Sequence, residues 1–408
     1  MINSRSDTRP QAVGKTSVRN IPILSLSQVV GTSAIAIFVL VGGLIGSEIA
    51  PTPALATLPV ALITVGVAVF TIPAALTMRR IGRRAGFSGS AFLASGAALL
   101  ALVAITQANF YLFCLAALLT GANGAFGMQY RFAAIESVEA VNAGKAVSFV
   151  LMGGILAGYL GPEIARRTRD WMGTAEYSGT FLVLALLYAG LAFVLLLLKD
   201  ITPATASSDG EQRPIRQTLT QPIYLVALLS GAVAYGVMTL IMTATPVHLH
   251  LSHNYSFDQT TLIIQSHIIA MFLPSLFTGF ILARFGILRV MGAGVVVMFV
   301  CVFLAMAGYD FSHFWGALVL LGLGWNLLFV GATVLLTNSY RPSERFKAQA
   351  ANDFTIFGIQ ALTSLSSGTL LYFASWGILL LTTLPFLLLV MAALVLQRRQ
   401  IWAVLAHA

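Results

Sequence analysis

Charged residues are scarce in this sequence: aspartate, glutamate, lysine and arginine together make up 9% of its 408 residues. A water-soluble domain carries roughly a quarter charged residues, which cover its surface. Hydrophobic residues make up 58% of the chain, the composition expected when a lipid bilayer surrounds most of a fold. The composition excludes an ordinary soluble domain and predicts an integral membrane protein.

Cysteine is scarce as well, with Cys114 and Cys301 the two in the chain. Both lie in apolar segments, where a small buried side chain is a commoner role than a disulfide or a metal ligand. The sequence also contains no Gly-Lys-Ser/Thr phosphate loop and no HExxH motif. We therefore expect neither ATP-driven transport nor an enzyme, and no cofactor.

The sequence is rich in long apolar segments instead. A helix needs about 20 apolar residues to cross a bilayer, and twelve segments meet that length, six in 21–199 and six in 221–397. The polar linker 200–220 separates the two sets, and polar tails occupy 1–20 and 398–408. We predict an all-α membrane protein of twelve transmembrane helices in two pseudo-symmetric six-helix bundles.

The basic residues set the predicted orientation. The formal net charge is +9, which in a soluble protein would suggest a nucleic-acid partner. Here the basic residues gather in the N-terminal tail, the linker and the loops 79–84 and 341–347, all on one side of a twelve-helix chain. Because such loops stay in the cytoplasm, we predict that both termini are cytoplasmic and that the chain lies in the cell inner membrane, surrounded by lipid. We expect a monomer that binds no nucleic acid.

The two halves of the sequence repeat each other. Gly82, after the second predicted helix, recurs as Gly286 after the eighth. Asn123 in "TGANGAF" of the fourth helix recurs as Asn326 in "LGWNLLF" of the tenth. A period near half the chain is typical of two parallel six-helix repeats.

These features resemble the major facilitator superfamily over nearly the whole chain. The family's Arg-x-Gly-Arg-Arg loop signature is matched by Arg80, Gly82, Arg83 and Arg84, although Arg79 stands where an acidic residue is usual. The resemblance implies a secondary transporter that works by alternating access.

Two shorter motifs resemble a narrower group, the CcoA-like transporters. Met238 and Met242 are four residues apart in the seventh predicted helix, and His267 and Met271 are four apart in the eighth. The resemblance implies either a copper importer that serves cytochrome oxidase assembly or a riboflavin importer of the RfnT type. The small-molecule substrate is thus riboflavin or a copper ion.

Copper would use these four side chains. Residues four apart share a helix face, and Met238 and His267 would both lie roughly 13 Å below the outer surface. Thioether and imidazole groups suit Cu(I), so the four could form a ladder of metal ligands across one helical hairpin. Methionine is also common packing material. A histidine at membrane depth is a functional candidate by default, and His267 could instead couple protons or bind an organic substrate.

A flavin would use amides and aromatic rings. Asn123, Gln129 and Asn326 lie in the fourth and tenth helices, which line the cavity in the resembled fold. A planar, neutral ligand is held by aromatic faces and amide groups, whereas a bare Cu(I) ion would not need so many amides. In the alternative interpretation these amides join helices by hydrogen bonds. The pattern favours riboflavin, and the aromatic candidates are Phe126, Tyr130, Tyr235, Trp325, Phe329 and Phe357.

Arg131 and Asp353 are charges that fall within predicted helices. Arg131 lies near the cytoplasmic end of the fourth helix and Asp353 near the start of the eleventh, and these helices face each other in the resembled fold. An unpaired charge at membrane depth is costly, so we hypothesise an ion pair that closes a cytoplasmic gate in the outward-open state. Alternatively, Arg131 extends to the membrane interface or pairs with Glu136 on its own helix, while Asp353 caps the eleventh helix near its N-terminus.

Overall fold

The computed structural model describes residues 17–139, 142–173, 175–199 and 213–401. Most of the predicted tails, and the linker as far as residue 212, lie outside these residues. All regular elements within them are helices, as predicted. The α-helices are α1 Asn20–Ile49, α2 Leu58–Thr106, α3 Phe110–Gly127, α4 Tyr130–Glu136, α5 Ala143–Thr168, α6 Ser178–Leu195, α7 Ile215–Leu219, α8 Pro222–Val247, α9 Phe257–Phe272, α10 Ser275–Phe285, α11 Ile287–Ala307, α12 Phe311–Thr337, α13 Arg345–Phe373, α14 Trp376–Leu381 and α15 Leu384–Leu396.

Most of these helices are apolar enough to span a bilayer. The described residues contain 10 such helices, or 11 when the bent pair α9–α10 is taken as one span. The pair bends by 44° at Pro274, the residue before α10. Proline has no backbone N–H and clashes with the preceding turn, so it breaks the helix there.

Helix α2 is too long for a single crossing. Its 49 residues would extend about 74 Å, whereas the hydrocarbon core is about 30 Å thick. At Gly82 the backbone leaves the helical region, with φ 83° and ψ 161°. Gly286, between α10 and α11, has nearly the same conformation, φ 85° and ψ 149°. Glycine adopts this region without steric cost, so the two repeat-related glycines make the same sharp turn.

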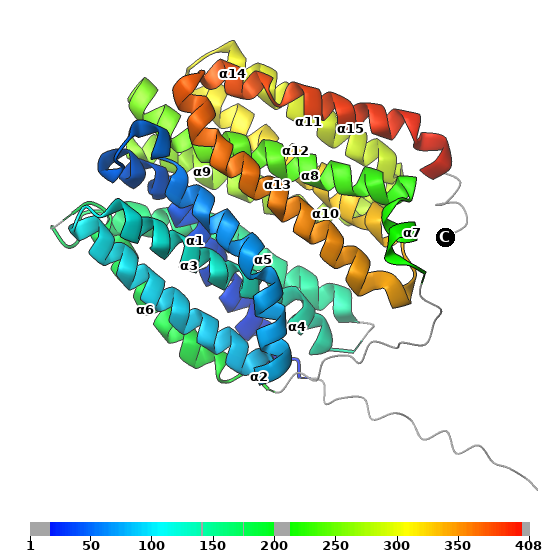
Figure 1. Cartoon of the computed structure of the whole chain (residues 1–408), viewed down its shortest axis with the longest axis horizontal. Helices are drawn as coiled ribbons and strands as arrows, with labels where there is room; N and C mark the ends of the chain where they lie inside the picture. Colours follow the sequence, from blue (N-terminus) through cyan, green and yellow to red (C-terminus); the bar gives the residue numbers. More distant parts are fainter. Residues whose placement is uncertain (1–16, 140–141, 174, 200–212, 402–408) are drawn as a thin grey trace, which may run out of the picture.

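The helices of each half of the sequence pack on one another. In the N-terminal half, α1–α6, helix α2 packs on α3 and α6, and α1 packs on α5. In the C-terminal half, α8–α15, helix α11 packs on α12, α8 on α13, and α12 on α9. Figure 1 shows the two halves side by side, and α1–α8, α2–α13 and α5–α9 are the main contacts between them.

Glycines bring α2 and α3 into backbone contact. A Cβ atom added at Gly121 would clash with the carbonyl oxygen of Ile63, and one added at Gly66 would clash with that of Leu118. Small residues at such crossings let helices associate in a bilayer, where the hydrophobic effect does not drive association. The crossing fixes α3 in place, and α3 leads directly to the break before α4.

The two halves touch at the ends of the helices that are predicted to face outward. Val247, at the end of α8, packs against Gly43 of α1. Arg166, near the end of α5, lies 3.8 Å from Asp258 at the start of α9. These contacts hold the predicted outer ends together.

Glu344 anchors the segment before α8 to the start of α13. Its buried carboxylate accepts two 2.7 Å hydrogen bonds from the guanidinium of Arg213. It also accepts bonds from the hydroxyl of Thr218 and the backbone N–H of Arg341. The hydrogen bonds from Arg213 lower the pKa of Glu344 to about 2, so Glu344 is ionised at neutral pH and holds the chain between the halves against the C-terminal half.

Candidate functional site

Asn326 of α12 lies at the break between α9 and α10. Its amide nitrogen donates to the carbonyl of Met271 at 2.7 Å and to the hydroxyl of Ser275 at 2.6 Å. Its amide oxygen accepts from the hydroxyl of Thr278 at 2.7 Å. Pro274 interrupts the backbone hydrogen bonds at this break, and the amide satisfies one of the carbonyl groups there. The fully buried side chain therefore stabilises the bend.

Its repeat partner makes a different contact. The side chain of Asn123 is also buried and donates to the hydroxyl of Ser90, in the second segment of α2, at 3.2 Å. Both asparagines thus join helices of the same half, as in the alternative interpretation of the sequence. A role of Asn123 and Asn326 in contacting substrate stays a prediction, and the site must be located from other residues.

These contacts predict unequal effects on stability. We expect Asn326→Ala to lower the thermal stability of purified protein more than Asn123→Ala. The first change removes three hydrogen bonds and the second removes one. At roughly 0.6 kcal/mol for each bond in a membrane protein, the difference is about 1 kcal/mol. Melting followed by tryptophan fluorescence in detergent measures it, and equal losses of stability contradict the assignment.

Trp325 of α12 lies in a cluster of aromatic rings. Its indole stacks on Phe329, with centroids 5.1 Å apart, and meets Tyr235 of α8 edge-on at 5.2 Å. Phe357 of α13 lies 5.8 Å from Tyr235, and Phe272 of α9 lies 6.4 Å from Trp325. We call these five residues the aromatic cluster. Its residues come from four helices of the C-terminal half, α8, α9, α12 and α13.

The aromatic cluster also reaches the N-terminal half. The ring of Phe272 lies against Gly154 of α5, where an added Cβ would be 3.0 Å from it. Tyr235, Phe272 and Phe329 are half-buried. The indole N–H of Trp325 is buried and has no hydrogen-bond partner among the described residues, which costs about 1–3 kcal/mol unless a ligand or water accepts it. The cluster thus combines three partly exposed rings with a buried indole donor that the described residues leave unpaired.

Arg131 and Asp353 lie beside this cluster. Arg131 is in α4, Asp353 is in α13 one turn before Phe357, and their Nη2 and Oδ2 atoms are 3.6 Å apart. The side chains are 32% and 34% exposed. Because residues four apart share a helix face, Asp353 lies next to Phe357 of the aromatic cluster. The pair joins the two halves of the chain.

The Arg131–Asp353 pair, at 3.6 Å, is longer than the 2.7 Å pairs Arg83–Glu136 and Arg213–Glu344. Glu136 is held by Arg83 through two 2.7 Å hydrogen bonds, so the alternative in which Arg131 pairs with Glu136 is wrong. The alternative in which Asp353 caps its helix is wrong too, because Glu344 precedes α13. The Nε atom of Arg131 is buried without a hydrogen-bond partner among the described residues. The pair therefore has unused hydrogen-bonding capacity.

Gln129 and Tyr130 lie at the break between α3 and α4. Gln129 precedes α4, is half-buried, and makes no capping hydrogen bond with its side chain. Tyr130 is buried against Phe87 of α2, with ring centroids 4.9 Å apart. Tyr130 thus packs inside the N-terminal half, whereas the Gln129 side chain, two residues before Arg131, does not cap α4. Substrate contact stays a prediction for both.

The structure does not assemble the predicted ladder of metal ligands. Helix α9 packs mainly on α12 and α5, and α8 on α13, α12 and α1, so α8 and α9 form no packed hairpin. His267 is fully buried, and its Nδ1 donates to the carbonyl of Leu318 in α12 at 2.8 Å. Met238 and Met242 are buried in α8, while Met271 lies at the α9–α10 break. The hairpin prediction was wrong because helices consecutive in sequence need not be neighbours in space.

The second ring nitrogen of His267, Nε2, is buried and has no hydrogen-bond partner among the described residues. Within those residues, no group of three histidine, cysteine, aspartate or glutamate side chains is placed to hold a metal ion. A role for His267 in transport stays a prediction, and the structure gives it no metal-binding partners of these types.

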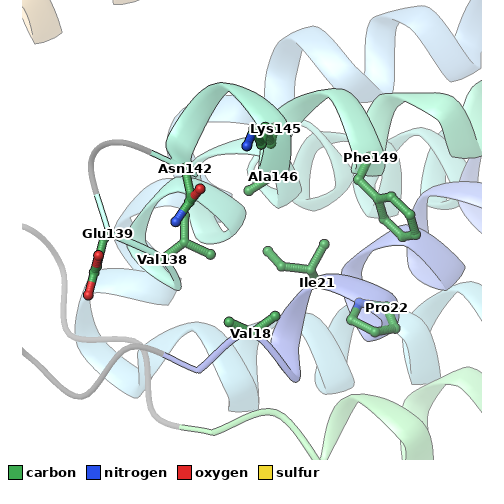
Figure 2. Close-up of a pocket in the computed structure, with 9 residues that line it drawn as sticks. All are labelled: Val18, Ile21, Pro22, Val138, Glu139, Asn142, Lys145, Ala146 and Phe149. Atoms are coloured by element: carbon green, nitrogen blue, oxygen red, sulfur yellow. The ribbon is translucent and has the colours of Figure 1, made fainter.

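A separate cavity of about 550 Å³ lies where α1 begins, beside the start of α5. Its walls include Ile21 and Phe149, with Lys145 and Asn142 nearby (Figure 2). The lining belongs entirely to the N-terminal half and includes none of the predicted site residues. The cavity is therefore distinct from the aromatic cluster.

Comparisons with known proteins identify relatives along the whole chain. The family model described as "Major Facilitator Superfamily" matches residues 24–256 and 227–404. The chain is 38% identical to "Riboflavin transporter RfnT" of Brucella anthropi, over 93% of this chain and 96% of that protein. It is 28% identical to "Uncharacterized MFS-type transporter YddS" of Bacillus subtilis, over 96% of this chain and 94% of that protein.

Solved structures of two other transporters share the fold of this chain. A bacterial homologue of the human lysosomal transporter Spinster, inward-facing and occupied, matches with a TM-score of 0.73 and 13% identity, over 93% of this chain and 96% of that one. A bacterial homologue of the iron transporter ferroportin, outward-facing, matches with a TM-score of 0.62 and 15% identity, over 93% and 99%. At these identities the likeness shows the fold alone. Taken with the family match, it follows that the chain belongs to the major facilitator superfamily and is a membrane transporter, not an enzyme.

Proposed function

We propose that this chain imports riboflavin across the inner membrane by alternating access. The observation that carries the proposal is the aromatic cluster around Trp325, which contacts both halves and has a free N–H. A flat, neutral ring system buries its faces against such rings and hydrogen-bonds at its edge. The 38% identity to a riboflavin transporter supports the same substrate. The copper alternative loses its basis, because its four ligands do not lie along one hairpin.

The proposed architecture has twelve spans in two six-helix bundles, 21–199 and 221–397. The ten candidate helices become eleven with the bent pair α9–α10, and the turn at Gly82 divides α2, which counts as one of these, into two spans, giving twelve. The matching turn at Gly286 supports the repeat. With this count, the tails 1–20 and 398–408 and the linker 200–220 are cytoplasmic. The transporter works as a monomer.

In this proposal Arg131 and Asp353 close the path on the cytoplasmic side when the transporter is open to the outside. They come from different halves and are each about one-third exposed. A gate of this kind must loosen when the outer ends close. The 3.6 Å separation, longer than the 2.7 Å of Arg83–Glu136, fits a structure whose predicted outer ends are in contact.

The test is rescue of a riboflavin auxotroph that lacks its own importer. We expect the chain to restore growth at low external riboflavin without changing cell copper. Arg167→Gln is the matched control, because Arg167 is 69% exposed and lies far along α5 from the cluster; it should rescue as well as the natural sequence. Failure to rescue together with a rise in cell copper would establish copper import instead.

A further inference from the structure

The Arg131–Asp353 pair has more hydrogen-bonding groups than the protein uses. A guanidinium has five N–H donors and a carboxylate about four acceptor sites. Here the two groups share one 3.6 Å contact, and Asp353 accepts one further hydrogen bond, from Asn352 at 3.1 Å. The guanidinium lies over the ring of Phe132 at 4.8 Å, and its Nε has no partner among the described residues. The pair is thus held in place with donors and acceptors to spare.

A flavin has one edge that matches this arrangement. The imide end of the isoalloxazine ring presents an N–H between two carbonyl oxygens, so it alternates acceptor, donor and acceptor. A guanidinium beside a carboxylate presents donors next to an acceptor. The guanidinium can donate to a ring carbonyl while the carboxylate accepts from the imide N–H. Hydrogen bonds to ionised groups are roughly twice as strong as neutral ones.

The position of the Arg131–Asp353 pair beside the aromatic cluster allows it to contact the imide edge. Asp353 is one helical turn from Phe357, which is 5.8 Å from Tyr235. A ring stacked in the aromatic cluster can therefore direct its imide edge at Arg131 and Asp353. On this basis, which rests on the proposed function, we propose that Arg131 and Asp353 recognise the imide edge of the flavin, with the free imide N–H as the feature that they select.

A comparison of two ligands on the unmodified protein tests this recognition. Purified protein in detergent is titrated with riboflavin and with 3-methylriboflavin, which carries a methyl group in place of the imide hydrogen, and flavin fluorescence reports binding. We expect 3-methylriboflavin to bind roughly ten- to a hundredfold more weakly, because its methyl group removes a hydrogen bond to a charged group and leaves the carboxylate unsatisfied. Lumiflavin, which has the same imide edge and lacks the ribityl chain, should compete with riboflavin.

Variants assign the effect to the pair. In Asp353→Ala the ratio of the two affinities should fall toward one, because the acceptor for the imide N–H is gone. Asp310→Ala is the control: this carboxylate is 87% exposed at the start of α12, and the ratio should stay unchanged. Equal binding of riboflavin and 3-methylriboflavin to the natural protein overturns the recognition of the imide edge and leaves riboflavin import standing. Binding of neither flavin overturns both.

Discussion

Trp325→Leu should reduce riboflavin binding roughly 5- to 150-fold and uptake in proportion. Leucine keeps an apolar side chain in the cluster but removes the ring that stacks on Phe329 and meets Tyr235. Loss of an aromatic surface under a flat heterocycle costs about 1–3 kcal/mol, a roughly 5- to 150-fold change in affinity. Trp325→Phe keeps a ring and loses the free N–H, so we expect an intermediate loss.

The measurement is a flavin fluorescence titration on purified, monodisperse variants, followed by uptake normalised to folded protein. Trp171→Leu is the matched control, because Trp171 is 67% exposed and lies outside the aromatic cluster; its affinity should equal that of the natural protein. A Trp325→Leu protein that is folded and binds riboflavin normally would place the substrate elsewhere.

The second large effect concerns the ion pair between the halves. Arg131→Asp and Asp353→Arg should each lower uptake more than tenfold, since each sets two like charges face to face at membrane depth. The exchanged protein, with both changes, should recover several times the uptake of the worse single variant. It restores one donor group and one acceptor group at the same 3.6 Å junction.

Labelling of a cysteine at the predicted outer ends of the helices reports whether the cytoplasmic gate is closed. Val247, the last residue of α8, is buried against Gly43 of α1, so Val247→Cys should react with a membrane-impermeant thiol reagent when the outer ends separate. The natural cysteines, Cys114 and Cys301, are buried. The single charge variants should label more slowly than the natural pair, because they favour the inward-open form. If the exchange is no better than the worse single variant and labelling never changes, the gate should be abandoned.

Sequence patterns predicted the features that depend on local chemistry. Apolar length predicted the helices, and the recurrence of Gly82 as Gly286 predicted a repeat. The structure adds that both glycines make the same turn, a backbone conformation that glycine adopts without strain. The pairing of Arg131 with a charge from the other half followed from the cost of burying a lone charge. The structure places Asp353 beside Arg131, while the role of the pair in gating awaits the test above.

Features that depend on helix order in space were not predictable in the same way. Met238 and His267 were expected to lie across one hairpin, yet α12 packs against both α8 and α9. Substrate contact by Asn326 stays a prediction, but its hydrogen bond to the backbone at the Pro274 bend could not be inferred from the sequence, because it depends on where α12 meets the α9–α10 break. Phe272 was missed altogether, since its place in the aromatic cluster follows from the bend and from the small Gly154 of α5.

The most direct test of riboflavin import uses purified protein in proteoliposomes that contain nothing else. Labelled riboflavin is supplied outside, with and without an imposed ion gradient, and Cu(I) uptake is followed in parallel. We predict saturable riboflavin accumulation that Trp325→Leu lowers in proportion to its loss of binding, with copper entry no faster than in empty liposomes. Copper accumulation without riboflavin uptake would contradict the proposed function.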